Sequence, residues 1–161
     1  MDIKSLNKFL KSSNINLKSF EILPIESRKG LLKFFRDNSN LYYCSGVYVF
    51  EKNSKIIYIG SCGKLKRVNN NIVASKNGIG SRLVRSNFPY SFIDDSLCYN
   101  RLKDSGNSKK KINYKNHISL NDIRIVFYET SLLISPTYIE HILLQYFLDK
   151  TNNLPLINNQ L

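Results

Sequence analysis

The chain has 161 residues, enough for one domain with its own hydrophobic core. Its hydrophobic fraction of 42% and aromatic fraction of 12% exclude a disordered chain. The 24 Lys and Arg residues exceed the 12 Asp and Glu residues, and the resulting net charge is +12. This excess suits nucleic acid or an acidic membrane surface, and nucleic acid is the favoured partner.

The sequence also bears on the compartment. No apolar run reaches the length of a membrane span, and the first four residues have no apolar signal core. The cysteines are odd in number and lack the spacing of metal ligands: Cys44, Cys62 and Cys98. An odd count suits reduced thiols. We therefore expect a cytoplasmic protein without a membrane partner.

The first 43 residues are predicted to be largely helical. Apolar residues recur at helical spacing over residues 2–12, and a second helix is expected over about residues 25–37. The simpler interpretation is that these helices cover a sheet. The alternative is an arm that contacts DNA or a second copy of the chain. We favour the covering role.

A β-hairpin is predicted next. Residues 46–50 (Gly-Val-Tyr-Val-Phe) and 56–59 (Ile-Ile-Tyr-Ile) are β-branched and aromatic, and a polar connector joins them. Each half contains a tyrosine, Tyr48 or Tyr58. Tyrosine is a good strand former, so on the hairpin alone both residues are interpreted as core residues rather than catalytic ones.

Two basic segments follow. Residues 61–77 are rich in Gly, Asn and Ser, and predict a loop. A helix is then expected from about residue 79 to residue 87, before a hydrophilic stretch centred on residues 103–111. Such a charge run is usually a solvated loop, but it could also follow a DNA backbone. The candidate DNA-binding residues are Lys64, Lys66, Arg67, Lys76, Arg85, Lys109, Lys110 and Lys111.

The C-terminal part predicts a third strand over residues 123–128 and a helix that begins after Ser135, with Pro136 in its first turn. Apolar residues surround most of this helix. Glu140 is its only acid before Asp149. A buried carboxylate needs an ion pair or a metal, whereas an exposed one near the helix start needs neither. Both interpretations of Glu140 are open at this point.

Gly46-Val47-Tyr48 followed by Tyr58-Ile59-Gly60 resembles the signature of the GIY-YIG nucleases, with Val47 in place of the usual Ile. The order of hairpin, helix with arginine, strand, helix with glutamate and closing asparagine also resembles that family over residues 44–161. The long connection after the hairpin is similar to that of the restriction endonuclease branch. The resemblance assigns the catalytic site to Tyr48, Tyr58, Arg82, Glu140 and Asn158.

In that family these groups surround one phosphate and one divalent metal. The resemblance therefore implies that Glu140 holds Mg²⁺ or Mn²⁺, that Tyr48 is the general base if its surroundings lower its pKa, and that Tyr58 positions phosphate or water. Arg67 competes with Arg82 for the arginine role, and Arg82 is favoured because it stands on a predicted helix. Ser61 takes the place of a frequent lysine.

The resemblance leads to a definite expectation. The fold is α+β: a small three-stranded antiparallel sheet flanked by helices, in one domain with a helical N-terminal arm (1–43) and a catalytic core (44–161). The function is a Mg²⁺-dependent double-strand DNA endonuclease of the Type II restriction kind, acting as a homodimer. The alternatives are a phage or mobile-element endonuclease of relaxed specificity and a non-catalytic DNA-binding module.

Overall fold

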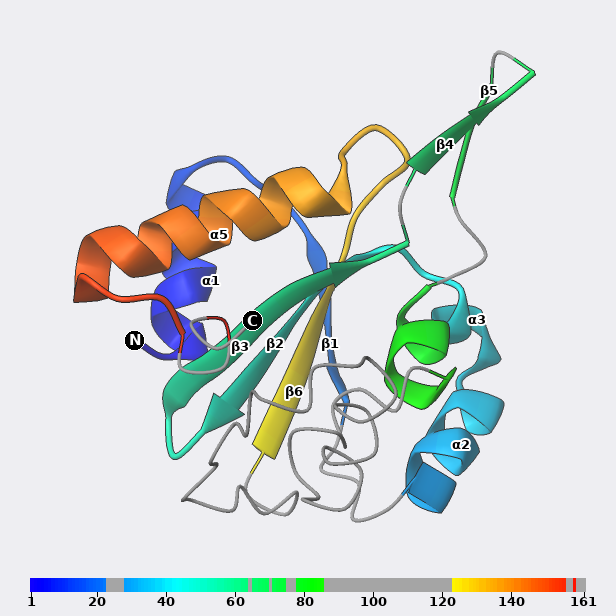
Figure 1. Ribbon diagram of the computed structural model, residues 1–161, viewed down its shortest axis with the longest axis horizontal. Coiled ribbons are helices and arrows are strands. Elements are labelled where there is room, and N and C mark those ends of the chain that lie inside the picture. The colour runs from blue at the N-terminus through cyan, green and yellow to red at the C-terminus, as the bar shows by residue number, and fades with distance from the viewer. Residues whose placement is uncertain are drawn as a thin grey trace, which may run out of the picture.

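The computed structural model describes residues 1–22, 28–63, 65–69, 71–74, 78–85, 123–155 and 158. Several predicted features lie outside these residues, namely the basic stretch 103–111 with Lys109, Lys110 and Lys111, and the loop residues Lys64 and Lys76. The fold is α+β, as predicted (Figure 1).

The sheet of the domain has four strands, and the prediction of three was wrong. The strands are all antiparallel, in the order β1 (Lys18–Ile22), β6 (Ile123–Glu129), β2 (Gly46–Lys52) and β3 (Lys55–Cys62). The additional strand is β1, which comes from the segment expected to be a helical arm. Its sequence, Lys-Ser-Phe-Glu-Ile, has the two-residue alternation of a strand.

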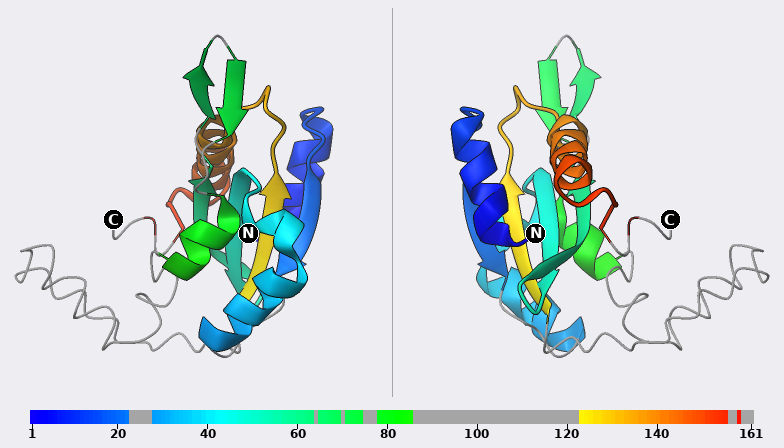
Figure 2. Two further views of the ribbon diagram at one scale, coloured as in Figure 1. Left: turned by 90° about the vertical axis from the view of Figure 1, so that its right-hand side faces the viewer. Right: turned by 90° about the vertical axis from the view of Figure 1, so that its left-hand side faces the viewer.

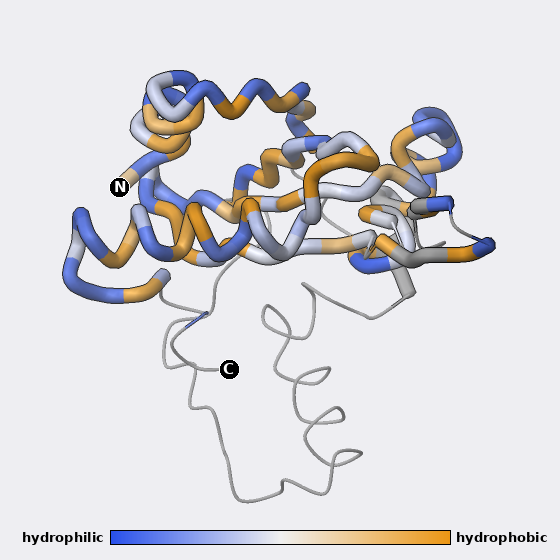
Figure 3. Tube along the Cα trace, turned by 90° about the horizontal axis from the view of Figure 1, so that it is seen from above, coloured by the Kyte–Doolittle hydropathy of each residue, from blue (hydrophilic) through white to orange (hydrophobic). Residues whose placement is uncertain are grey.

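The core lies on both faces of this sheet. Strand β2 is buried on both sides because helices cover each face, so its sequence is almost continuously apolar. Helices α1 (Ile3–Ser12) and α5 (Pro136–Thr151) pack on the face that carries Val47 and Val49. Hydrophilic and hydrophobic residues alternate along α1 in Figure 3, as expected for a helix with one face on a sheet, whereas apolar residues surround most of α5.

The opposite face carries the two tyrosines of the hairpin. Tyr48 and Tyr58 belong to a second core cluster with Phe35, Leu41 and Leu83. These three residues come from α2 (Arg28–Asp37), α3 (Ser39–Tyr42) and the short π-helical segment η1 (Ser81–Arg85). Of the helix predicted at residues 79–87, Ser81–Arg85 form a π-helical segment, and residues 86 and 87 lie outside the described part of the chain.

The N-terminus is fixed to the sheet by polar contacts. Asp2 caps α1 by accepting a hydrogen bond from the Ser5 amide at 2.9 Å, and the Met1 carbonyl accepts from the Ile56 amide at 3.0 Å. The carboxylate of Glu51, only 8% exposed, accepts a hydrogen bond from the Ile3 amide at 2.9 Å. Helix α1 is thus an integral layer of the fold.

The prediction of a loop over residues 61–77 was also wrong. Within it, β4 (Leu65–Val68) and β5 (Asn71–Ala74) form a separate two-stranded ribbon. The Gly, Asn and Ser content suggested a loop, but Val68, Ile72 and Val73 are β-branched residues around a turn. Asn69, with φ of 48°, occupies the left-handed region that such a tight turn requires.

Candidate active site at the end of strand β3

The hydroxyls of Tyr48 and Tyr58 converge above Gly60. Tyr48 lies directly opposite Gly60 in the β2–β3 pairing, and the rings of the two tyrosines are 5.9 Å apart between centroids. A Cβ atom at Gly60 would lie 2.7 Å from the Tyr58 hydroxyl oxygen and 2.9 Å from that of Tyr48. Only glycine leaves room for both hydroxyls at this position. This is a physical reason for a glycine at position 60.

Arg82 reaches these hydroxyls from η1. Its Nε donates a hydrogen bond to the Tyr48 hydroxyl at 3.1 Å, and its side chain is also hydrogen-bonded to Tyr58. Segment η1 is held in place because Ile79 is fully buried and its amide donates to the Cys44 carbonyl at 3.0 Å. The structure therefore brings together three of the predicted site residues.

Burial shifts the pKa of both tyrosines of the site. Removal from water raises the pKa of Tyr48 well above its usual value, and the nearby Arg82 guanidinium only partly offsets this rise. Burial likewise raises the pKa of Tyr58. A general-base role for Tyr48 depends on a metal and basic surroundings lowering its pKa, and in the protein alone burial raises it. Both hydroxyls are consequently protonated at neutral pH.

Glu140 approaches from the other side of β3. Because successive residues of a strand face opposite sides, Ser61 points to α5 while Gly60 faces η1. The Ser61 hydroxyl donates a hydrogen bond to Glu140 Oε2. Glu140 is also close enough for its charge to contribute to the raised pKa of Tyr58. The start of α5 and η1 thus meet the end of β3 from two sides (Figure 1).

Sequence reasoning missed the role of Ser61. The residue stood out only as a departure from the lysine that often follows the motif, whose charge it lacks, although its hydroxyl can donate a hydrogen bond. Its position in the strand could have indicated the role, because the residue after Gly60 faces the opposite side of the sheet, where the helix with Glu140 lies. Ser61 therefore belongs to the candidate site as the partner of the carboxylate.

Asn158 supports the site through the backbone. Its side-chain oxygen accepts a hydrogen bond from the Ile59 amide at 2.9 Å, and its side-chain nitrogen donates to the Ile59 carbonyl at 2.8 Å. Strand β3 is the edge of the sheet, so Asn158 satisfies backbone groups that no strand pairs. Asn158 thus fixes the backbone between Tyr58 and Gly60. Both of these hydrogen bonds go to the backbone, and neither goes to a tyrosine hydroxyl.

The carboxylate of Glu140 could hold a hard cation. Across the described part of the chain, no group of three or more His, Cys, Asp or Glu side chains forms a metal cluster. Mg²⁺ needs oxygen ligands but is often bound by one or two carboxylates, with several waters retained. A single half-buried carboxylate beside a serine hydroxyl fits such a site.

Of the predicted DNA-binding residues, the structure describes the backbone of three. The backbone of Arg67 lies in β4 opposite Ile72, its side chain is outside the described part of the structure, and the arginine that contacts the tyrosines is Arg82. The backbones of Lys66 and Arg85 lie in β4 and η1, and their side chains are outside the described part of the structure.

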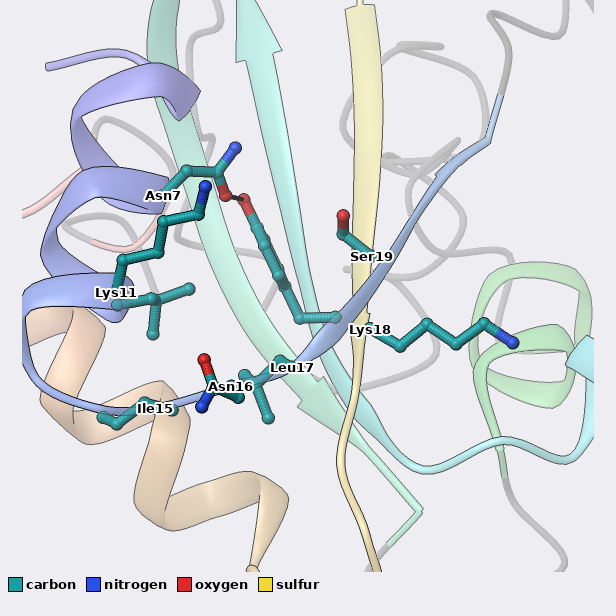
Figure 4. Close-up of a pocket in the computed structure, with 9 residues that line it drawn as sticks. Asn7, Lys11, Ile15, Asn16, Leu17, Lys18 and Ser19 are labelled. Carbon is teal, nitrogen blue, oxygen red and sulfur yellow. Dashed lines mark hydrogen bonds between the residues drawn. The ribbon is translucent and has the colours of Figure 1, made fainter.

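A separate cavity of about 500 Å³ lies between α1 and β1, near the opposite edge of the sheet (Figure 4). Asn7, Lys11 and Asn16 contribute polar groups to its lining, and the buried Tyr128 hydroxyl donates to Asn7 Oδ1 at 2.8 Å. None of the tyrosine, arginine and glutamate residues of the candidate site lines this cavity.

Comparisons with protein-family models, with curated proteins and with solved structures find no match to this chain. Among the helices that the structure describes, none is both long enough and apolar enough to span a membrane.

Proposed function

We propose that this protein is a Mg²⁺- or Mn²⁺-dependent endodeoxyribonuclease of the GIY-YIG kind, a hydrolase that cuts double-stranded DNA. The observation that carries the proposal is the convergence of the Tyr48 and Tyr58 hydroxyls with Arg82 beside Gly60. Glu140 adds a carboxylate across the same strand. This is a compact set of donors and one metal ligand, as hydrolysis of a phosphodiester requires.

Each group has a chemical task in this proposal. The Arg82 guanidinium would stabilise the negative charge that develops on the phosphate, and the Tyr58 hydroxyl would orient a phosphate oxygen or the attacking water. A divalent ion held by Glu140 would supply further positive charge. Tyr48 can serve as general base only when the bound substrate complex lowers its pKa, because in the protein alone burial keeps it protonated.

The basic excess supports DNA as the substrate. A net charge of +12 favours contact with phosphates, and affinity should then fall steeply with salt. A chain this small that cuts both strands would act as a homodimer on a twofold-symmetric site, as Type II restriction enzymes do. Cys44 and Cys62 are free thiols, which supports a cytoplasmic location in this proposal.

Nicking of a supercoiled plasmid, with and without Mg²⁺, tests the proposal. Glu140→Gln should abolish cleavage while DNA binding persists, because the amide keeps the shape and removes the charge that holds the metal. Asp149→Asn is the matched control, since Asp149 is an exposed acid farther along the same helix. Cleavage by Glu140→Gln at the wild-type rate would contradict the assignment.

The same assay separates the alternatives. DNA binding without Mg²⁺-dependent cleavage would favour the non-catalytic binding module. Cleavage at many unrelated positions of one plasmid would favour a phage or mobile-element enzyme of relaxed specificity. Mapped ends at a single repeated sequence would favour the restriction enzyme.

A further inference from the structure

The β4–β5 ribbon stands apart from the rest of the described structure. Its strands hydrogen-bond to each other and not to the four-stranded sheet. The ribbon extends beyond the end of the sheet in Figure 1 and in the views of Figure 2, which are turned by 90°. An isolated two-stranded ribbon is only marginally stable in water. A partner that packs against it would supply the stabilising contacts.

One face of the ribbon exposes a distinctive set of side chains. Directly paired residues and residues two apart share a face, so Val68, Asn71 and Val73 lie on the same side. Val68 is 48% exposed and Val73 is 38% exposed, and Asn71 is exposed beside them. Exposed valines in an otherwise uncovered ribbon are a contact surface that has no partner within the described chain.

The segment of sequence that contains this face is basic. The sequence from Gly63 to Gly78 contains four basic residues, Lys64, Lys66, Arg67 and Lys76, and no acidic residue. Such a composition is complementary to a phosphate backbone and unsuited to a basic protein surface. It selects nucleic acid over a second copy of this chain, whose own net charge is +12.

The face matches one kind of base pair in particular. The major groove of B-DNA is about 12 Å wide and admits a two-stranded β-ribbon. In that groove, the asparagine amide pairs with adenine N6 and N7, and apolar side chains contact the thymine methyl group. Asn71 and the two valines therefore offer the contacts that distinguish A·T pairs from G·C pairs.

We propose that the ribbon face formed by Val68, Asn71 and Val73 enters the major groove of the DNA substrate and reads A·T pairs beside the cleaved bond. The inference rests on the proposed nuclease function. It places the reading element next to the chemistry, because β4 begins at Leu65, four residues after Ser61, the partner of Glu140.

Duplexes in which uracil replaces thymine test the recognition of the methyl groups. Uracil keeps the same base pairing and lacks only the C5-methyl group. Anisotropy measurements in EDTA, at fixed salt, should show that an A·T-rich duplex binds about fourfold more weakly for each recognised methyl group that uracil removes, the effect expected for burial of one methyl group. Val68→Ser combined with Val73→Ser should bind both duplexes equally.

The matched control is Leu132→Ser combined with Leu133→Ser. These residues are also exposed, at 50% and 89%, but lie in the turn before α5 rather than on the ribbon. This control variant should keep the wild-type preference for thymine. Equal binding of both duplexes by the wild type, or an unchanged preference in the ribbon variant, would overturn the inference.

Two further outcomes separate this inference from the function it rests on. A thymine preference without Mg²⁺-dependent cleavage would uphold the ribbon contact and refute the nuclease. Cleavage without a thymine preference would do the reverse. Sedimentation without DNA compares the self-association of the wild type and the ribbon variant. If the wild type self-associates and the ribbon variant does not, the ribbon face binds a second copy of the chain, and the proposed DNA contact is overturned.

Discussion

Asn158→Ala should destabilise the protein through the edge of the sheet. The substitution removes the two hydrogen bonds, of 2.9 and 2.8 Å, that join the side chain to the Ile59 backbone. At about 1 kcal/mol for each bond, the expected loss is about 2 kcal/mol in the free energy of unfolding. For a domain of this length, that corresponds to a decrease of about 4–8 °C in Tm.

Two measurements check this expectation. Calorimetry gives the change in Tm, and amide hydrogen exchange should show that the Ile59 amide loses protection in the variant. Asn158→Asp should also lose the bond to the Ile59 carbonyl, because a carboxylate cannot donate. Asn153→Ala is the control, since its exposed side chain makes only a local contact with Thr151. Unchanged exchange at Ile59, or equal Tm decreases for Asn153→Ala and Asn158→Ala, would refute the reasoning.

Three other predictions concern the site and the N-terminal layer. Arg82→Lys should slow plasmid cleavage about 100-fold with little change in DNA affinity, because lysine lacks the forked donor; a wild-type rate would remove Arg82 from catalysis. Glu51→Ala should cost about 1–3 kcal/mol in chemical denaturation, since the buried Ile3 amide loses its acceptor; no loss would show that water replaces it. Because burial raises the pKa of Tyr48 and Tyr58, unfolding releases protons above about pH 10, and stability should fall as pH rises beyond that value. Phe at either position should flatten this fall in urea titrations, and an unaltered slope would argue against burial of the hydroxyl.

The sequence predicted the elements that contain long runs of apolar residues. Strands β2 and β3 and helix α5 have strong apolar patterns, and the helix begins at Pro136 as expected. Strand β1 was missed because it is short and half polar, and because only its pairing with β6 shows what it does. The ribbon was missed because its asparagines, which form and flank the turn, resembled a loop.

The site could be predicted only in part for a similar reason. The residue types of the tyrosines, Arg82 and Glu140 are visible in the sequence, and the resemblance to the GIY-YIG signature suggested which of them to consider together. The position of Ser61 against Glu140, and the bonds from Asn158 to Ile59, depend on strand facing and on contacts across about a hundred residues. The burial that raises the pKa of Tyr48 also follows only from the packed structure.

The order of the strands constrains how this chain can fold during synthesis. Strand β6 lies between β1 and β2, although it is made about a hundred residues after β1. Among the described strands, β1 has no neighbour and β2 can pair only with β3 until residues 123–129 have been synthesised. At about 5–20 residues per second, the ribosome takes several seconds to span this gap. The N-terminal strand must therefore wait with its edge unpaired, which makes the nascent chain sensitive to aggregation and to chaperones that bind exposed strands.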